Sequence, residues 1–353
     1  MKIVNADAKN FDVTNMHPYK IIERIGRICY KSEDAITDDS AVRFVTRMCE
    51  NKHYAMLEHA RAIFLFSDML ANKLVSALTT AMITSSNDDI GYFIRYISIT
   101  RTNDQTIVSG SFRTWIELSE YAETHRDFKA ITQYVNAALS AYYPELFPAS
   151  DTLLTDEVEL ITREDLIDII RHTTETAPTL ADTIADNHLQ HTILFTCDRG
   201  VSHELVRHRP ASFAQESTRY CNYSKDKFGN NITVIKPCFF DEDSAEYKLW
   251  YDACINAENA YFDLLALNAA PQQARDVLPT STKTEIAVTA LEREWRHIIN
   301  LRYRGLTGAP HPQMREIMQI AYPYLVSESD TRLSIEHIGA LEDADTTLRQ
   351  ILS

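Results

Sequence analysis

Apolar residues along the chain recur with two different spacings. Short runs at 60–67, 191–197, 230–237 and 285–289 have the length of buried strands, and the run 91–100 is also rich in β-forming residues. Helical spacing is found at 40–50, 112–122, 128–142, 157–172, 245–268, 292–302 and 312–325, and SHELV (202–206) can also be a helix. This mixture predicts an α/β (α+β) protein in which a β-sheet is flanked by long helices.

The middle of the chain differs in character from its two flanks. Residues 150–190 hold ten Asp or Glu against two Arg, and a proline-bearing loop at 142–151 precedes them. We therefore expect residues 68–188 to be a large, mainly helical insertion. The core would be a discontinuous domain formed by 1–67 and 189–330, followed by a C-terminal tail at 331–353.

Composition excludes several classes of function. The net charge is −15, which argues against a nucleic-acid surface. No apolar run approaches the length of a membrane span, and the N-terminus lacks a signal-peptide pattern. Six cysteines without a CxxC pair indicate reduced thiols in a cytoplasmic protein. No histidine pair has a carboxylate at metal-ligand spacing, so no metal site is expected.

The segment RHRPASFAQESTRY (207–220) concentrates cations and hydroxyls in an acidic chain. Arg207, His208 and Arg209 are adjacent and cannot share one face of a helix or strand, so the backbone must turn here. Pro210 biases its predecessor away from the helical region. One interpretation is a helix end that leads into a phosphate-binding loop. The alternative is a surface cluster paired with Glu204 and Glu216 in the same part of the sequence.

Four segments resemble flavin-dependent thymidylate synthases, in that family's order. The segment GVSHELVRHRPASFAQESTRY contains the family's RHR, seven residues and Ser, with Arg219 two residues beyond. The others are HYAMLEH (53–59), QQARDVLP (272–279) and WRHIINLR (295–302). The resemblance covers about 1–60 and 190–325. It implies the family's fold, interrupted by the insertion.

This resemblance also implies an activity. Family members make dTMP from dUMP with methylenetetrahydrofolate as carbon donor and FAD, reduced by NADPH, as hydride source. The chain would then be a homotetramer with shared active sites, without nucleic-acid or membrane partners. By position, the residues implied for FAD are His53, Arg207, His208, Arg209, Gln215, Arg293 and His297. The residues implied for dUMP are Glu204, Arg207, Gln215, Glu216, Ser217, Thr218, Arg219, Arg275 and Arg302.

The resemblance gives Arg302 the catalytic role beside the uracil ring. A permanent cation there would stabilise negative charge as it develops. No carboxylate–histidine relay is evident for Ser217, so we interpret it as a phosphate ligand rather than a nucleophile. On an ideal helix Arg293 and His297 share a face, whereas Arg302 lies opposite. We therefore expect flavin contacts on one side of this helix and the uracil contact on the other.

Three departures from the family pattern leave alternatives open. Ala290 and Leu291 replace the usual Gly-Asn pair, so a flavoprotein without methyl transfer and a nucleotide-binding regulator remain rivals. The stretch 108–115 (VSGSFRTW) echoes 288–295 (VTALEREW), although four loose matches arise readily by chance. The loop 303–311 is longer than in compact members, and its His311 either caps the flavin site or is a loop residue. The third departure is the insertion at 68–188, which has no counterpart in the short family members and would cover the site, mediate assembly or bind a partner. The folate contacts and the choice of NADPH over NADH are not readable.

Overall fold

The computed structural model describes residues 1–84, 92–103, 105–147, 149, 156–219, 223–224 and 229–341. Gly91, Cys221 and residues 342–353, which belong to segments discussed above, lie outside this part. The chain divides into two compact units. Unit 1 consists of Met1–Asp12, Gly26–Asp34 and His191–Ser353, and unit 2 of Val13–Ile25 and Ala35–Gln190.

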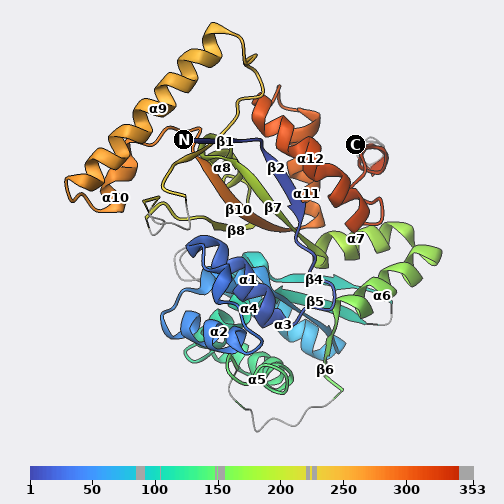
Figure 1. Ribbon diagram of the computed structural model, residues 1–353. Helices are drawn as coiled ribbons and strands as arrows, with labels where there is room; N and C mark the ends of the chain where they lie inside the picture. The colour runs from blue at the N-terminus through green and yellow to red at the C-terminus, as the bar shows by residue number, and fades with distance from the viewer. Residues whose placement is uncertain are drawn as a thin grey trace. The chain divides into compact units, whose positions relative to one another are not determined.

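Unit 1 is built on a sheet with the strand order β2-β7-β10-β8 among the described residues (Figure 1). These strands are β2 (Asp7–Asn10), β7 (Gln190–Asp198), β8 (Ser212–Gln215) and β10 (Lys283–Leu291). A parallel pair joins β1 (Lys2–Val4) to β9 (Thr233–Ile235). The helical segments are α8 (Arg199–Leu205), α9 (Ala245–Ala266), α10 (Pro271–Ala274), η5 (Arg275–Val277), α11 (Glu292–Ile298), η6 (Ile299–Arg304) and α12 (Pro312–Glu328). Phe195, Val288 and Trp295 are fully buried in its core, which also stabilises the elements that carry the motif.

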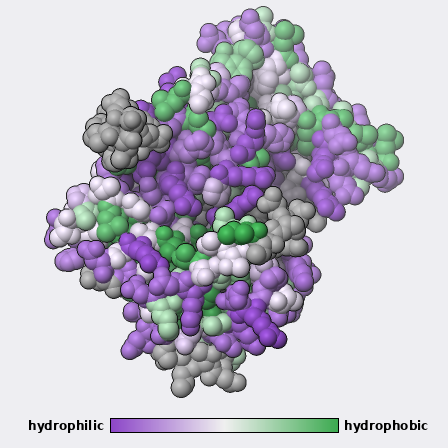
Figure 2. Space-filling view, turned by 180° about the vertical axis from the view of Figure 1, so that it is seen from behind, coloured by the Kyte–Doolittle hydropathy of each residue, from purple (hydrophilic) through white to green (hydrophobic). Residues whose placement is uncertain are grey.

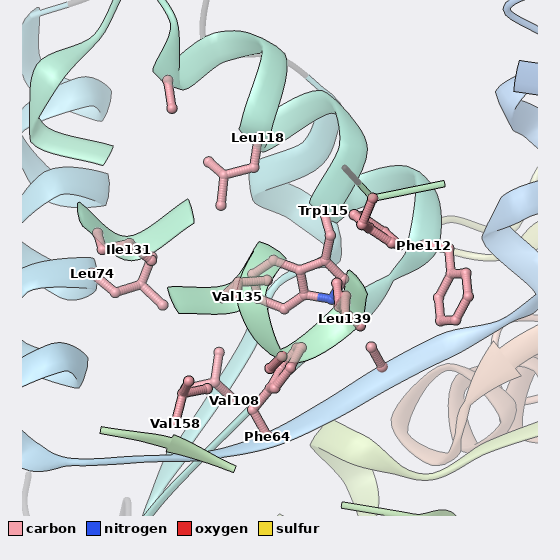
Figure 3. Close-up of a cluster of buried hydrophobic side chains, with 14 of the residues drawn as sticks. Phe64, Leu74, Val108, Phe112, Trp115, Leu118, Ile131, Val135, Leu139 and Val158 are labelled. Atoms are coloured by element: carbon pink, nitrogen blue, oxygen red, sulfur yellow. The ribbon is translucent and has the colours of Figure 1, made fainter. Parts of the chain in front are cut away.

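Unit 2 holds an antiparallel sheet with the order β4-β5-β3-β6. Its strands are β3 (Arg61–Phe66), β4 (Ser98–Arg101), β5 (Thr106–Ser111) and β6 (Val158–Ile161). The helices are α2 (Ser40–Glu50), α3 (Asp68–Thr84), α4 (Phe112–Ala122), α5 (Arg126–Ser140), α6 (Arg163–Thr176) and α7 (Pro178–His188), with 3-10 turns η2 (Tyr54–His59) and η3 (Tyr92–Tyr96). Helix α1 (Pro18–Tyr30) and η1 (Glu33–Ala35) include residues of both units. Figure 3 shows the core, where Phe64 of β3 meets Trp115 of α4 edge to face at 5.2 Å.

The mixture of helices and sheets is as predicted, but several elements differ. The apolar run 60–67 forms β3, which pairs with β5 and β6 of the expected insertion. The helix expected over 157–172 is wrong at its start, because β6 precedes it and Thr162 caps α6 by accepting from the Asp165 N–H at 3.1 Å. The strand expected over 91–100 is confirmed only from Ser98, after the 3-10 turn η3.

The compact units do not follow the expected domain boundaries. Residues 13–25 and 35–67, which we assigned to the core domain, belong to unit 2. The expected tail begins in unit 1, where Leu333 and Ile338 are buried. Residues 68–188 therefore share a sheet and a hydrophobic core with residues that precede them. They are not a separate helical domain, because the earlier residues cover apolar surface that such a domain would leave exposed.

The two sheets follow one plan, although each unit has its own core. Read in reverse, β6-β3-β5-β4 of unit 2 corresponds to β2-β7-β10-β8 of unit 1. In both units each central strand leads directly into a helix: β7 into α8 and β10 into α11, β3 into α3 and β5 into α4. Helix α12 contacts β2 as α5 contacts β6. We refer to this arrangement as the shared plan.

The strand-to-helix junctions of the shared plan agree in detail. Ser111, at the end of β5, has φ −65° and ψ 160°, and Leu291, at the end of β10, has φ −69° and ψ 158°. Four residues later, Trp115 and Trp295 are buried, with exposed fractions of 1% and 0%. The echo between 108–115 and 288–295 therefore reflects the same local structure.

The units differ where unit 1 carries its cations. Helix α3 of unit 2 runs for 17 residues, whereas α8 of unit 1 stops after seven, just before the motif. Seven residues after Trp295 comes Arg302, and seven after Trp115 comes the buried Ala122. Both units keep the framework, but unit 2 lacks the motif's positive charges.

Candidate functional site

The motif lies at the end of α8, where the predicted turn is present. Asp198 caps this helix, since its Oδ1 accepts from the Val201 N–H at 2.7 Å. The helix ends at Leu205 and is followed by a turn that contains a cis peptide bond before Pro210. Residues 206–210 form a turn and a bend, so the backbone changes direction within the motif.

The three motif side chains separate by burial. His208 is 5% exposed, whereas Arg207 and Arg209 are exposed. Neither arginine forms a salt bridge with any residue that the structure describes. The predicted pairing with Glu204 or Glu216 is therefore not seen, and the two guanidinium groups are available to an anion.

Polar side chains cover most of the face in Figure 2, where apolar residues occur in smaller groups.

Arg302 is held by two residues of the α8 region. Its Nε donates to Nε2 of His208 at 3.0 Å, and its NH1 group donates to Oε2 of Glu204 at 2.8 Å. Burial, with the nearby charge of Arg302, lowers the pKa of His208 to about 4. His208 is thus neutral near pH 7 and accepts the hydrogen bond at Nε2, so its proton lies on Nδ1.

A π-helical segment overturns the expectation that His297 and Arg302 face opposite ways. The rings of His297 and His208 lie 6.0 Å apart, and Arg302 donates to the same His208. Helix α11 continues as the π-helical η6, in which hydrogen bonds join residues five apart. His297 and Arg302 are five residues apart, so the wider turn brings them to one side.

The segment from Gln215 to Arg219 is fixed by its backbone and by the Gln215 side chain. Gln215 Nε2 donates to Ser202 Oγ at 2.8 Å and to Thr284 Oγ1 at 3.2 Å. The Ser217 N–H donates to the Cys29 carbonyl at 3.0 Å. Arg275 approaches from η5, where its NH1 group lies 3.5 Å from Thr218 Oγ1. Ser217, Thr218, Arg219 and Arg275 are therefore brought together within one chain, whereas the resemblance implies that Arg275 comes from a neighbouring subunit.

Glu216 lies in this segment but its carboxylate faces the protein. It is 2% exposed, and its Oε2 accepts from Lys283 Nζ at 3.1 Å. Its N–H donates to the Glu285 carbonyl at 2.8 Å, and its carbonyl accepts from Arg199 at 3.2 Å. Glu285 also pairs with Lys31. Burial disfavours the Lys283 cation, but Glu216 and Glu285 outweigh this and raise its pKa.

No pattern in the sequence indicates this polar network, in which Lys31, Glu216, Lys283 and Glu285 form ion pairs and Arg199 donates to the Glu216 carbonyl. Lys31 and Glu285 are 254 residues apart, and no motif connects them. Its four ion-paired residues line a cavity of about 750 Å³ together with Lys2, Tyr223 and Asn231. Glu216, which we predicted to contact dUMP, therefore helps to hold in place the segment that carries Ser217.

The remaining predicted residues are more dispersed. His53 is exposed and lies in unit 2, next to η2. Arg293 lies in α11 with Glu294 at 3.9 Å, a long contact. Ala290 and Leu291, which replace the family's Gly-Asn pair, are 4% and 7% exposed and pack in the interior. His311 caps α12, because its Nδ1 accepts from the Gln313 N–H at 3.3 Å.

Two kinds of feature are absent from the described residues. They contain no group of three His, Cys, Asp or Glu side chains arranged to hold a metal ion. None of their helices is both long and apolar enough to cross a bilayer.

The chain is similar to known proteins over its second half. Residues 155–326 match the family model described as thymidylate synthase complementing protein. The flavin-dependent thymidylate synthase of Corynebacterium aurimucosum is 33% identical over 160 residues, which are 41% of this chain and 61% of that protein. Those of Pyrococcus furiosus and Corynebacterium glutamicum are 32% and 36% identical over 30% of this chain and 43% and 45% of their own lengths.

A comparison of structures gave a weaker likeness. The UMP/dUMP methylase PolB from Streptomyces cacaoi, solved with 5-Br dUMP, aligns with a TM-score of 0.36 and 17% identity, over 57% of this chain and 87% of that one. This chain spans about three fifths or less of the curated relatives cited above. Residues 155–326, which match the family model, include the motif segment, and the curated relatives cited above are flavin-dependent thymidylate synthases.

Proposed function

We propose that this protein is a flavin-dependent thymidylate synthase, which methylates dUMP to dTMP with methylenetetrahydrofolate as carbon donor and NADPH-reduced FAD as hydride source. One observation carries the proposal. Within the segment that matches the family, Arg302 is held by His208 and Glu204, beside the exposed Arg207 and Arg209. A fixed cation next to unpaired cations suits a substrate with an ionisable ring and phosphate groups.

The arginines of the motif fit the diphosphate of FAD. Arg207 and Arg209 are exposed and form no salt bridge within the described residues, so their guanidinium groups can accept bidentate phosphate contacts. When bound, FAD would supply the hydride that the reaction requires. The protein's own contribution would be to bind the cofactor's phosphates and to orient the ring, with His53, Gln215, Arg293 and His297 as further proposed contacts.

Ser217, Thr218, Arg219 and Arg275 would bind the phosphate of dUMP. Hydrogen bonds already join the members of this group: the Arg219 N–H donates to Ser217 Oγ at 3.3 Å, and Arg275 reaches Thr218. Two guanidinium groups and two hydroxyls match the acceptor oxygens of a monophosphate. Gln215 and the backbone of Glu216 would keep this segment in place beneath the nucleotide.

Arg302 would act on the uracil ring. A guanidinium has five N–H donors, and the contacts with His208 and Glu204 use two of them. The others can reach a uracil carbonyl, where a fixed positive charge stabilises negative charge on the ring. Glu204, also proposed to contact dUMP, and His208 would position Arg302 at no reorganisation cost during the reaction.

The test is a visible absorption spectrum of the purified protein, followed by anaerobic turnover of dUMP with methylenetetrahydrofolate and NADPH. Bound flavin and dTMP formation that is lost in Arg302→Ala, but kept in the exposed Arg315→Ala, would support the proposal. Flavin without dTMP would favour a flavoprotein with another acceptor. Binding of dUMP without flavin, even after addition of FAD, would favour a nucleotide-binding regulator.

The family resemblance also leads us to propose a homotetramer with shared active sites. Light scattering tests this directly, because four chains of 40.4 kDa have a mass well separated from that of a monomer or dimer. A monomer or dimer with full activity would remove the tetramer from the proposal and leave the chemistry standing.

A further inference from the structure

A cavity of about 350 Å³ lies within unit 1 beside α8, and neither Arg207 nor Arg209 is among its lining residues. It is enclosed by α8, the segment after β9, α9, residues 279–281 and the start of α12. Glu204 lines it, so it adjoins the position where Arg302 is held. We refer to it as the Asp198 cavity, because Asp198 is its most buried charged residue.

Asp198 has one carboxylate oxygen in use and one without a partner. Oδ1 accepts the capping hydrogen bond from Val201, while Oδ2 is buried and makes no hydrogen bond with any residue that the structure describes. The whole residue is 5% exposed. Burial raises the pKa of this carboxyl group, although the capping N–H opposes the shift. A buried acceptor without a donor is unfavourable, and a ligand that donates to Oδ2 would remove this cost.

The other walls of the cavity indicate the shape of that ligand. Trp250 and Phe239 offer aromatic surface, and Val201 and Ile235 add aliphatic surface. The ring of His311 meets Phe239 edge to face at 5.6 Å. Flat apolar surface beside the polar side chains of Asp198, Thr280, Ser281 and Gln313 suits a planar ring that carries hydrogen-bonding groups.

The acidic side chains of the cavity disfavour an anionic ligand. Asp198 and Glu204 both line the cavity, and none of the described residues that line it is Lys or Arg. A phosphate or carboxylate group would therefore meet two carboxylates, with His311 as the single lining side chain among the described residues that can carry a positive charge. The phosphates of the nucleotide and flavin must bind elsewhere, and the cavity is left for a neutral or cationic ring.

We propose that the Asp198 cavity binds a planar heterocycle through ring or amide N–H groups that donate to Asp198 Oδ2. Two sources have this chemistry: the aminopyrimidinone ring of a reduced folate and the carboxamide of a nicotinamide ring. Naming these two sources rests on the proposed function. The requirement for a planar donor comes from the cavity itself.

Ring-only probes test the cavity without phosphate or glutamate groups. Pterin and nicotinamide are titrated separately into the purified protein by calorimetry, and Trp250 fluorescence is followed in parallel. Trp115 and Trp295 are fully buried in the two cores, so the change should vanish in Trp250→Phe. We expect one of the two probes to bind, which also identifies the source. Binding of neither would overturn the proposal.

Asp198→Asn is the sharpest variant, because it separates the two oxygens. Asn is an equally good helix cap through its Oδ1, so α8 is retained. Its amide nitrogen replaces Oδ2 with a donor that faces the ligand's own donors. We expect the bound probe's Kd to rise at least tenfold with an unchanged Tm. An unchanged Kd would overturn the proposal. Asp165→Asn, at the exposed start of α6, is the matched control and should leave Kd unchanged.

The two proposals fail in different ways. If the wild-type protein makes dTMP but Asp198→Asn leaves probe binding and the KM values for folate and NADPH unchanged, the cavity proposal is wrong and the activity stands. If a probe binds in an Asp198-dependent manner and no dTMP is made, the cavity proposal stands and the activity does not.

Discussion

Arg302 and His208 form a hydrogen bond in which the imidazole accepts, with 3.0 Å between Nε of the arginine and Nε2 of the histidine. This polarity requires a neutral His208, and burial beside Arg302 keeps the imidazole neutral. A protonated His208 would repel Arg302 and lose the acceptor. The arrangement of the site therefore depends on a histidine that does not take up a proton at ordinary pH.

Replacing Arg302 tests its proposed role on uracil. We expect Arg302→Ala to lower kcat for dTMP formation by about 10²–10³-fold, as for the loss of an oxyanion-hole donor. Arg302→Lys should recover only part of this, because one ammonium group cannot reproduce the planar fork. Steady-state kinetics with dUMP would measure both. A kcat within twofold of wild type in Arg302→Ala would remove Arg302 from the chemistry.

His208 predicts a pH dependence of stability. Its pKa is about 4 in the folded protein against 6.5 for an ordinary histidine, so between these values the unfolded chain binds more protons. The contribution of His208 is complete above pH 6.5 and declines as the pH falls towards 4. Urea unfolding from pH 4 to 7 should show this slope, and His208→Asn should reduce it. Titration of His208 near pH 6.5 by NMR would contradict the prediction.

We expect Lys283, which belongs to no sequence motif, to contribute strongly to the free energy of unfolding. Its side chain is 17% exposed and that of its partner Glu216 is 3% exposed, so Lys283→Met leaves a buried carboxylate without its cation. We expect a loss of about 3–5 kcal/mol in the free energy of unfolding. Denaturant unfolding would measure it.

The double variant Lys283→Met with Glu216→Gln controls for this effect. Removing both charges should restore much of the stability, because no uncompensated carboxylate remains buried. Any weakening of dUMP binding that persists in the double variant would then report the displaced segment rather than global unfolding. Equal destabilisation in the single and double variants would show that the ion pair itself is unimportant.

The two buried tryptophans, Trp115 and Trp295, should contribute similarly to the free energy of unfolding. Trp115→Ala and Trp295→Ala each remove a fully buried ring, and we expect each to lower the free energy of unfolding by about 3–5 kcal/mol. Phe at either position should lose less, since most of the volume is kept. Thermal unfolding of the four variants would compare them. Tolerance of Trp115→Ala would show that unit 2 does not depend on this packing.

Periodicity was a good guide where a local pattern decides the structure. Helix α4 covers the predicted 112–122, and α9 differs from the predicted helix only by a shorter end. The segment 157–172 misled because the apolar residues of β6 fit either period, and only pairing with β3 makes them a strand. Pairing between strands that are distant in the sequence cannot be predicted from one segment alone.

The candidate site shows the same limit. The motif and the turn at Pro210 could be predicted, since both depend on adjacent residues. The π-helical η6 could not, because the wider turn depends on how the helix packs and no residue pattern in 299–304 specifies it. Glu216 was placed with the ligand residues by position, whereas its distant partner Lys283 determines where its carboxylate points.

The shared plan leaves the two halves of the chain under unequal constraint. In unit 2 the positions equivalent to the motif lie within the uninterrupted helix α3, and Ala122 stands where unit 1 has Arg302. Apart from His53, which we propose as an FAD contact, we assign no ligand contact to unit 2, so we expect packing to be the main constraint on its framework. In unit 1 the same framework must also keep a fixed pattern of charge. Related chains should therefore drift faster in unit 2 at surface positions while both halves retain the same buried skeleton.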